Sequence, residues 1–237
     1  MTANDGSPVA PRPSRQGEAV TMAPASGYPP ASAIRLLPMR CEDIASNPDF
    51  RHLSTVPGIA LDLRYAGVRN FVGRDLYGSL DCAWLHHLAA AGLERAAALL
   101  AREAPGHRLL VLDAVRPHRV QILLWDHLEG TDLRQYVADP ARGSIHSFGM
   151  ALDATLQDPE GRELDMGTGY DEMRELSHPK LEMKHLASGE LTQTQHGNRQ
   201  LLRGVLGRSG FQGIDNEWWH FEMLDRQHVR QHFTRVD

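Results

Sequence analysis

Strands are predicted at four places along this chain by the arrangement of its apolar residues. Residues 150–156 and the end of residues 56–65 alternate between apolar and polar positions, which is typical of a strand with one buried face. Residues 109–112 form a continuous apolar run, which favours a fully buried strand. The aromatic and apolar segment 218–223 predicts the last strand, and the first is expected to end at Tyr65.

Three segments between these strands predict helices. Residues 81–102 are rich in alanine and leucine at helical spacing, with Asp81 as the candidate N-cap. Pro117 begins a second helix, over residues 117–127, because proline suits a first helical turn. Residues 196–209 predict a third helix. Since helices and strands follow one another without a regular βαβ repeat, we expect an α+β fold, with helices around a small, mainly antiparallel sheet.

The composition divides the chain into a leader and one domain. Residues 1–33 are rich in proline, alanine, serine and glycine and hold few large apolar side chains, which predicts a disordered leader. The remainder, residues 34–237, is long enough for a single folded domain with a sizeable core. The sequence makes no prediction of the oligomeric state.

Charge and hydropathy exclude two classes of partner. The net charge is -5 and no basic stripe stands out, so nucleic acid is not an expected partner. No apolar run approaches the roughly 18 residues of a membrane helix. The N-terminus has no continuous apolar segment of the secretory type, so we expect a cytoplasmic protein with Cys41 and Cys82 reduced. No CxxC motif is present, which excludes a cysteine-built zinc site.

One pair of candidate metal ligands lies in the segment 144–153. His146 and Asp153 are seven residues apart, and Gly149 between them permits a turn that could bring both side chains to one point. Asp153 stands in an apolar stretch, and a buried carboxylate needs a cation or a metal. The alternative is an ordinary turn at Gly149 with Asp153 exposed to solvent.

A second pair of candidate site residues, a spare carboxylate and an imidazole, lies in the segment Glu217-Trp218-Trp219-His220. Residues three apart face opposite sides of an ideal strand, so Glu217 and His220 share a site only if Glu217 precedes the strand or lies on a bulge. The alternative is a tryptophan-rich strand with incidental polar ends. By contrast, the adjacent His86 and His87 fall within the predicted helix 81–102, where neighbouring side chains diverge, so they are not expected to share a site.

Arg116 follows a predicted buried strand and precedes Pro117, which favours an extended backbone at Arg116. Its guanidinium could stabilise an oxyanion, although a surface salt bridge is the more ordinary role for an arginine.

Taken together, these motifs resemble the D-alanyl-D-alanine dipeptidases of the VanX type, zinc peptidases that share the pattern SxHxxGxAxD and a later ExxH. Ser144, His146, Gly149, Ala151 and Asp153 match every fixed position of the first pattern, and residues 217–220 match the second. The segments 164–171, 177–178 and 113–117 also resemble this branch, with Val115 where tyrosine is expected.

The resemblance implies zinc-dependent hydrolysis of D-alanyl-D-alanine to two D-alanines, with one zinc per subunit and a zinc-activated water. It implies that His146, Asp153 and His220 hold the zinc, that Glu217 is the general base, and that Arg116 stabilises the tetrahedral intermediate. Other residues would contact the substrate: Asp171, Ser144 and Tyr65.

Two other functions stay open at this point. One is a D,D-carboxypeptidase or endopeptidase that acts on peptidoglycan stem peptides, and the other is a non-catalytic zinc-binding module. Two histidines and one aspartate would also accept divalent ions other than zinc.

Overall fold

The computed structural model describes Met1 and residues 36–237. The predicted disordered leader, residues 1–33, therefore lies outside the described residues apart from Met1. The described part that follows belongs to one unit, Arg35–Asp237. Within it, no helix is both long and apolar enough to cross a membrane.

A five-stranded sheet in the order β2-β4-β5-β7-β6 forms the centre of this unit. Its strands are β2 (Ile59–Leu61), β4 (Arg108–Asp113), β5 (Ala151–Gln157), β6 (Phe211–Gly213) and β7 (His220–Met223). Only β2 pairs in parallel, with β4, and the other three pairings are antiparallel. A separate antiparallel pair consists of β1 (Phe50–His52) and β3 (Trp84–His86).

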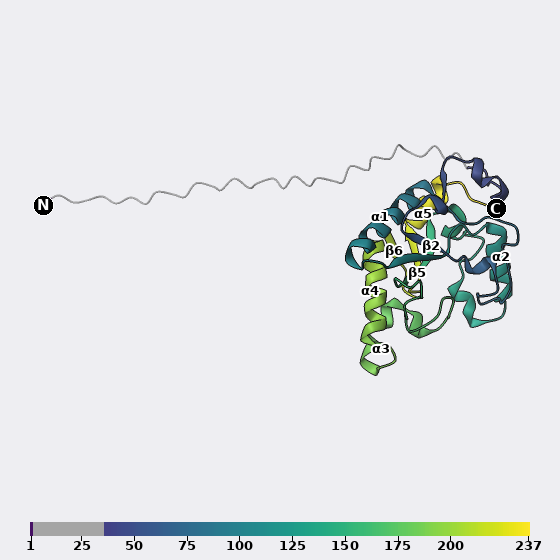
Figure 1. Cartoon of the computed structure of the whole chain (residues 1–237). Helices are drawn as coiled ribbons and strands as arrows, with labels where there is room; N and C mark the ends of the chain where they lie inside the picture. The colour runs from purple at the N-terminus through teal and green to yellow at the C-terminus, as the bar shows by residue number, and fades with distance from the viewer. Residues whose placement is uncertain (2–35) are drawn as a thin grey trace. The chain divides into compact units, whose positions relative to one another are not determined.

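Helices surround the sheet, as Figure 1 shows. They are α1 (His87–Glu103), α2 (His118–His127), α3 (Glu182–Ser188), α4 (Gln193–Gly207) and α5 (Arg226–His232). Short 3-10 helices connect them, including Arg64–Ala66, Asp132–Tyr136 and Ile145–Phe148. The predicted fold class, an α+β fold with a mainly antiparallel sheet, is confirmed.

The two faces of β5 separate the core from the site. Leu152, Ala154 and Leu156 belong to the main hydrophobic cluster, together with buried residues of α1 and α4. Because side chains alternate along a strand, Asp153 and Thr155 point to the opposite face, and both are buried. Strand β5 therefore presents the carboxylate of Asp153 on one face of the sheet, while its other face packs into the hydrophobic core.

The predicted strand over residues 56–65 is wrong at its end. Strand β2 ends at Leu61, and Tyr65 lies in the 3-10 helix Arg64–Ala66. β2 is an edge strand whose only partner is β4, and the register of β4 shifts between Val111 and Asp113. After Leu61 the chain leaves the sheet, so the backbone of Tyr65 does not continue the β ladder. The ring of Tyr65 instead packs edge-on against other aromatic rings.

The predicted helix over residues 81–102 begins too early. Residues 84–86 form β3, which pairs with β1, and the helix α1 starts at His87 with the His86 side chain as its cap. Asp81 instead accepts a hydrogen bond from the backbone N–H of Ala83. The pairing of β3 with a distant strand is a non-local contact that helical periodicity cannot reveal.

The remaining predicted elements are present with small shifts of their ends. Strand β4 extends the predicted run by one residue at each end, β5 is shifted by one residue toward the C-terminus, and α2 begins one residue after Pro117. Helix α4 begins at Gln193 because Thr192 and Gln195 form a capping box, and β7 begins at His220. Cys41 and Cys82 are free and buried.

Gly149 provides a test of the local backbone. It has a φ of 65°, and a Cβ there would lie 2.7 Å from the His86 nitrogen and 2.8 Å from Phe50 Cε1. Gly149→Ala should therefore lower the free energy of unfolding by roughly 1–3 kcal/mol, measured by urea denaturation. The matched control is Gly204→Ala in α4, where a Cβ meets nothing within 4 Å. That change should raise stability by about 0.5–1 kcal/mol, and equal effects of the two substitutions would contradict the account.

Candidate metal centre and active site

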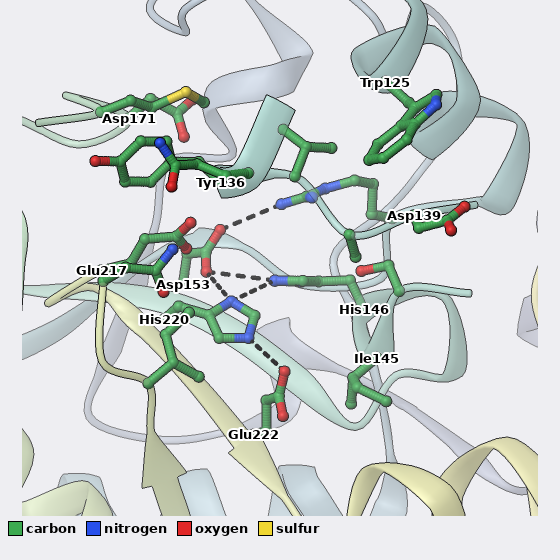
Figure 2. Close-up of a pocket in the computed structure, with 18 of the residues that line it drawn as sticks. Trp125, Tyr136, Asp139, Ile145, His146, Asp153, Asp171, Glu217, His220 and Glu222 are labelled. Atoms are coloured by element: carbon green, nitrogen blue, oxygen red, sulfur yellow. Dashed lines mark hydrogen bonds and ion pairs between the residues drawn. The ribbon is translucent and has the colours of Figure 1, made fainter. Parts of the chain in front are cut away.

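Three buried side chains converge on one point from three segments. Asp153 on β5 and His220 on β7 are register partners, so their side chains lie side by side on the same face. His146 comes from the 3-10 helix Ile145–Phe148, whose end at Gly149 turns the chain into β5. Figure 2 shows the three side chains pointing toward one another. The sequence-predicted ligands are thus brought together.

The donor atoms of these residues form a small triangle. His146 Nε2 lies 3.1 Å from His220 Nδ1, and Asp153 Oδ1 lies 3.3 Å from the first and 2.9 Å from the second. Ligands about 2.0–2.1 Å from a tetrahedral zinc are separated by roughly 3.3 Å. The triangle therefore has the size of one face of a zinc tetrahedron.

The outer hydrogen bonds of the two rings decide which nitrogen carries a proton. His146 Nδ1 lies 2.8 Å from the carbonyl oxygen of Ala114, which can only accept, so Nδ1 donates. His220 Nε2 lies 2.8 Å from Glu222 Oε1, a carboxylate oxygen, so Nε2 donates there. In the neutral rings the lone pairs of His146 Nε2 and His220 Nδ1 then face each other and Asp153. Such a cluster requires a positive charge.

The pKa values of Asp153 and His220 also indicate that the cluster needs a positive charge. Burial alone would raise the pKa of Asp153, but His146 and His220 hold it well below its usual range. Burial alone would lower the pKa of His220, yet its hydrogen bonds to Asp153 and Glu222 raise that pKa to about 10. A proton on His220 or a divalent cation supplies the missing charge, and the donor set of two imidazoles and one carboxylate fits zinc.

Glu217 lies at the edge of the triangle. It precedes β7, as the sequence required if Glu217 and His220 were to reach one site. Within residues 36–237 its carboxylate makes no hydrogen bond or ion pair, and burial raises its pKa to about 7. Its carboxylate thus gains and loses a proton near neutral pH, as a general base should.

Arg116 is buried next to the metal cluster rather than on the surface. Its Nε donates to Asp113 Oδ2 at 2.8 Å, and its Nη2 donates to Asp153 Oδ2 at 3.3 Å. A third donor contacts Gln121 at 3.1 Å. The surface salt bridge considered from the sequence is therefore excluded, and the guanidinium is held in a fixed direction beside the pocket.

A pocket with a cavity volume of about 330 Å³ is lined by the three candidate ligands together with Glu217 and Arg116. Its lining also contains the three predicted substrate contacts, Asp171, Ser144 and Tyr65. Asp171 has a φ of 58°, an unusual backbone conformation for a residue other than glycine. Its Oδ1 accepts a hydrogen bond from the Tyr65 hydroxyl at 3.3 Å, whereas Oδ2 is buried with no partner among the described residues. Burial raises the pKa of Asp171 well above its usual range.

Comparison with known proteins connects this geometry to a family. The peptidase family model described as D-ala-D-ala dipeptidase matches residues 49–237. The D-alanyl-D-alanine dipeptidase of Escherichia coli (strain K12) is 38% identical over 167 residues, 70% of this chain and 80% of that protein. The D-alanyl-D-alanine dipeptidases of Enterococcus faecalis (strain ATCC 700802 / V583) and Enterococcus faecium are 30% and 31% identical, each over 75% of this chain and 92% of the relative.

The chain belongs to the D-Ala-D-Ala dipeptidase family. It is therefore an enzyme of the peptidase class, and the resemblance expected from the two motifs is confirmed. The candidate metal centre lies inside the matched region, as do Glu217, Arg116 and the predicted substrate contacts.

This dipeptidase family member has a second group of potential metal ligands, and it corrects one prediction. Asp49, His86 and His87 offer ligand atoms within 4.8 Å of one another, because His86 is the last residue of β3 and His87 the first residue of α1, so the two do not lie within one helix. However, His86 Nδ1 accepts a hydrogen bond from the backbone N–H of Leu88, so its Nε2 carries the proton in the neutral ring. Asp49 and His87 are exposed, so the buried cluster of His146, Asp153 and His220 is the better candidate for a metal site.

Several residues around the site did not emerge from the sequence. The Tyr170 hydroxyl donates to Asp153 Oδ2 at 3.0 Å, and Glu222 contacts both His220 and Arg226. Glu222 could have been found from the spacing His-x-Glu, because residues two apart share one face of a strand. Val115, which stands where the family resemblance leads one to expect tyrosine, is fully buried in a hydrophobic cluster and does not line the pocket.

The choice between the two ligand groups can be tested by metal binding. The purified protein should bind one zinc per chain, measured by titration calorimetry after chelator treatment, because three lone pairs converge at the buried cluster. His146→Ala should abolish tight binding. The matched control is His87→Ala, which removes a histidine from the exposed group and should leave binding unchanged. Loss of zinc in His87→Ala, with retention in His146→Ala, would contradict the assignment.

Proposed function

We propose that this enzyme hydrolyses the D-alanyl-D-alanine dipeptide to two D-alanines in a zinc-dependent reaction. The observation that carries the proposal is one pocket, in a chain of the D-Ala-D-Ala dipeptidase family, that combines a buried metal-ligand triangle with an unpaired carboxylate at its edge. The triangle consists of His146, Asp153 and His220, and the carboxylate is Glu217. The cytoplasmic location remains a prediction from the sequence.

Glu217 is the proton carrier in this proposal. A zinc ion at the triangle would lower the pKa of a water molecule and polarise the substrate carbonyl. Glu217, whose carboxylate no other described group engages, accepts the proton of the attacking water. The protonated carboxyl then delivers that proton to the leaving amine, and the carboxylate is restored for the next turnover.

Arg116 stabilises the charge that develops on the carbonyl oxygen. Its contacts to Asp113 and Gln121 fix the guanidinium before the substrate arrives, so no reorganisation is needed during the reaction. The same guanidinium and the hydroxyl of Tyr170 both face Asp153 Oδ2, which leaves Oδ1 directed at the two histidines. Arg116 thereby supports the metal ligand as well as the oxyanion.

Asp171 recognises the free ammonium group of the dipeptide. A buried carboxylate oxygen without a partner is unfavourable, and an ammonium donor would satisfy Oδ2. Tyr65 holds the other oxygen of Asp171, and Ser144 lines the same pocket, where we assign it to the contacts with the substrate termini.

The direct test is release of D-alanine from D-alanyl-D-alanine by purified protein, with and without chelator and added zinc. Release that the chelator abolishes and zinc restores is the expected result. Glu217→Gln should bind zinc and lose about 10²–10⁴-fold in turnover, since this is the usual contribution of general acid–base catalysis. No release by zinc-loaded protein would reject this substrate, and cleavage of stem peptides instead would favour the carboxypeptidase or endopeptidase alternative.

The pH profile tests the role of Glu217 separately. The base must be ionised, and burial raises its pKa to about 7, so kcat/KM should increase with pH and level off above that value. A bound cation would lower the pKa, so the midpoint should lie at or below about 7. The profile of kcat/KM is measured on the zinc-loaded enzyme. A profile with no acidic limb, or with a midpoint well above 7, would show that another group accepts the proton.

Substrate selection tests the role of Asp171. An N-acetylated dipeptide lacks the ammonium group. Burial raises the pKa of Asp171, so without that cation its charged form is disfavoured and the ion pair that would bind the substrate is lost. We therefore expect at least a 100-fold lower kcat/KM for N-acetyl-D-alanyl-D-alanine than for the free dipeptide. The matched variant Asp171→Asn should reduce this preference while zinc binding is retained. Equal cleavage of both dipeptides by the wild-type enzyme would refute the role.

A further inference from the structure

Glu222 lies behind the candidate metal centre and contacts the outer nitrogen of His220. It lies two residues after His220 on β7, so both side chains are on the same face of the strand. Its Oε1 lies 2.8 Å from His220 Nε2, and its Oε2 accepts a hydrogen bond from Arg226 Nε at 2.5 Å. The residue is only 8% exposed, although it is a glutamate. Figure 2 shows it on the opposite side of the imidazole from Asp153.

The contact fixes both the tautomer and the direction of the His220 ring. A carboxylate can only accept a hydrogen bond, so Nε2 must carry a proton and the lone pair of Nδ1 is directed at Asp153 and His146. Without Glu222, the proton could reside on Nδ1 and donate to Asp153 Oδ1. The ring would then present an N–H, and not a lone pair, to a metal ion.

The two histidines are oriented by different kinds of partner. His146 Nδ1 donates to the backbone carbonyl of Ala114, which is neutral and cannot be removed by a side-chain substitution. His220 Nε2 donates to the charged side chain of Glu222, which also adds negative charge close to the cluster. Hydrogen bonding of this kind raises the basicity of a metal-bound imidazole. Asp113 Oδ2 also lies near His146 Nδ1, but at the longer distance of 3.5 Å. The short hydrogen bond of His146 therefore goes to the backbone, whereas that of His220 goes to a replaceable side chain.

We propose that Glu222 is a positioning residue that prepares His220 for metal binding, and that Arg226 acts only indirectly, by holding Glu222 in place. The inference deepens the proposed function, since it concerns the same metal centre, but it requires only that a divalent cation binds there. Arg226 is half-exposed, and its bond goes to the oxygen that does not contact His220. The hydrogen bond to His220 is thus separable from the ion pair with Arg226.

The test is the zinc dissociation constant, measured by chelator competition without substrate. Glu222→Leu should raise it about 10–100-fold, the usual effect of removing such a partner. Glu222→Gln should lose less, because its amide oxygen still accepts from Nε2. Arg226→Met should change the constant by less than about threefold, because the bond to His220 remains.

Glu182→Gln is the matched control for folding. Glu182 is also a buried glutamate paired with an arginine, at 2.7 Å from Arg203, but it does not line the metal pocket. Its substitution should lower the unfolding temperature and leave zinc affinity unchanged. If Glu222→Leu itself unfolds, the ratio of zinc affinities between Glu222→Gln and the wild-type enzyme decides, with a loss of at least threefold expected.

Two results would overturn the proposal. The first is wild-type zinc affinity in a folded Glu222→Leu protein. The second is an equal loss in Arg226→Met, which would assign the effect to the ion pair. If zinc affinity falls as expected while the wild-type enzyme does not cleave D-alanyl-D-alanine, the positioning role holds and only the proposed substrate is wrong.

Discussion

The structure depends on one electrostatic constraint, the convergence of three electron-pair donors at a buried point that requires a positive charge. Asp153, His146 and His220 come from separate segments. The ladder between β5 and β7 holds the first and last side by side, and the turn at Gly149 joins the segment of His146 to β5. Removal of one partner from a buried charged cluster typically costs roughly 3–5 kcal/mol. A cation at this point is therefore coupled to the order of the central sheet, and metal binding and folding should support each other.

The groups around the triangle orient the carboxylate of Asp153 toward the two histidines. The two oxygens of Asp153 have separate tasks, because Arg116 and Tyr170 contact Oδ2 and the two histidines face Oδ1. The apolar layer on the other face of β5 keeps water away from the strand that carries Asp153. The candidate site thus lies on the polar face of β5, and the opposite face packs into the hydrophobic core. Glu217 lies at the edge of the site, where its carboxylate makes no hydrogen bond or ion pair with another described residue.

The sequence predicted those parts of the molecule whose signals are local. The apolar run of β4 and the alternation of β5 located the sheet, and a carboxylate amid apolar residues identified Asp153 as a site residue. The start of α1 was missed because β3 forms only through pairing with β1, which lies more than 30 residues earlier in the chain. Glu222 was missed because a glutamate at an alternating position of a short strand resembles a solvent-facing residue, and only the structure shows that its partner is the candidate ligand His220. The family resemblance gave the expected roles of the site residues. The tautomers of His146 and His220 follow only from their hydrogen bonds in the structure, because no sequence pattern contains that information.

The central claim is that zinc binds at the buried triangle and is held by the lone pairs that the outer hydrogen bonds direct inward. Anomalous X-ray diffraction at the zinc edge, on crystals of the zinc-loaded protein, tests this most directly. The account predicts one strong peak about 2.0–2.2 Å from His146 Nε2, His220 Nδ1 and an oxygen of Asp153. A peak at Asp49, His86 and His87 with none at the buried triangle, or coordination through His220 Nε2, would contradict it.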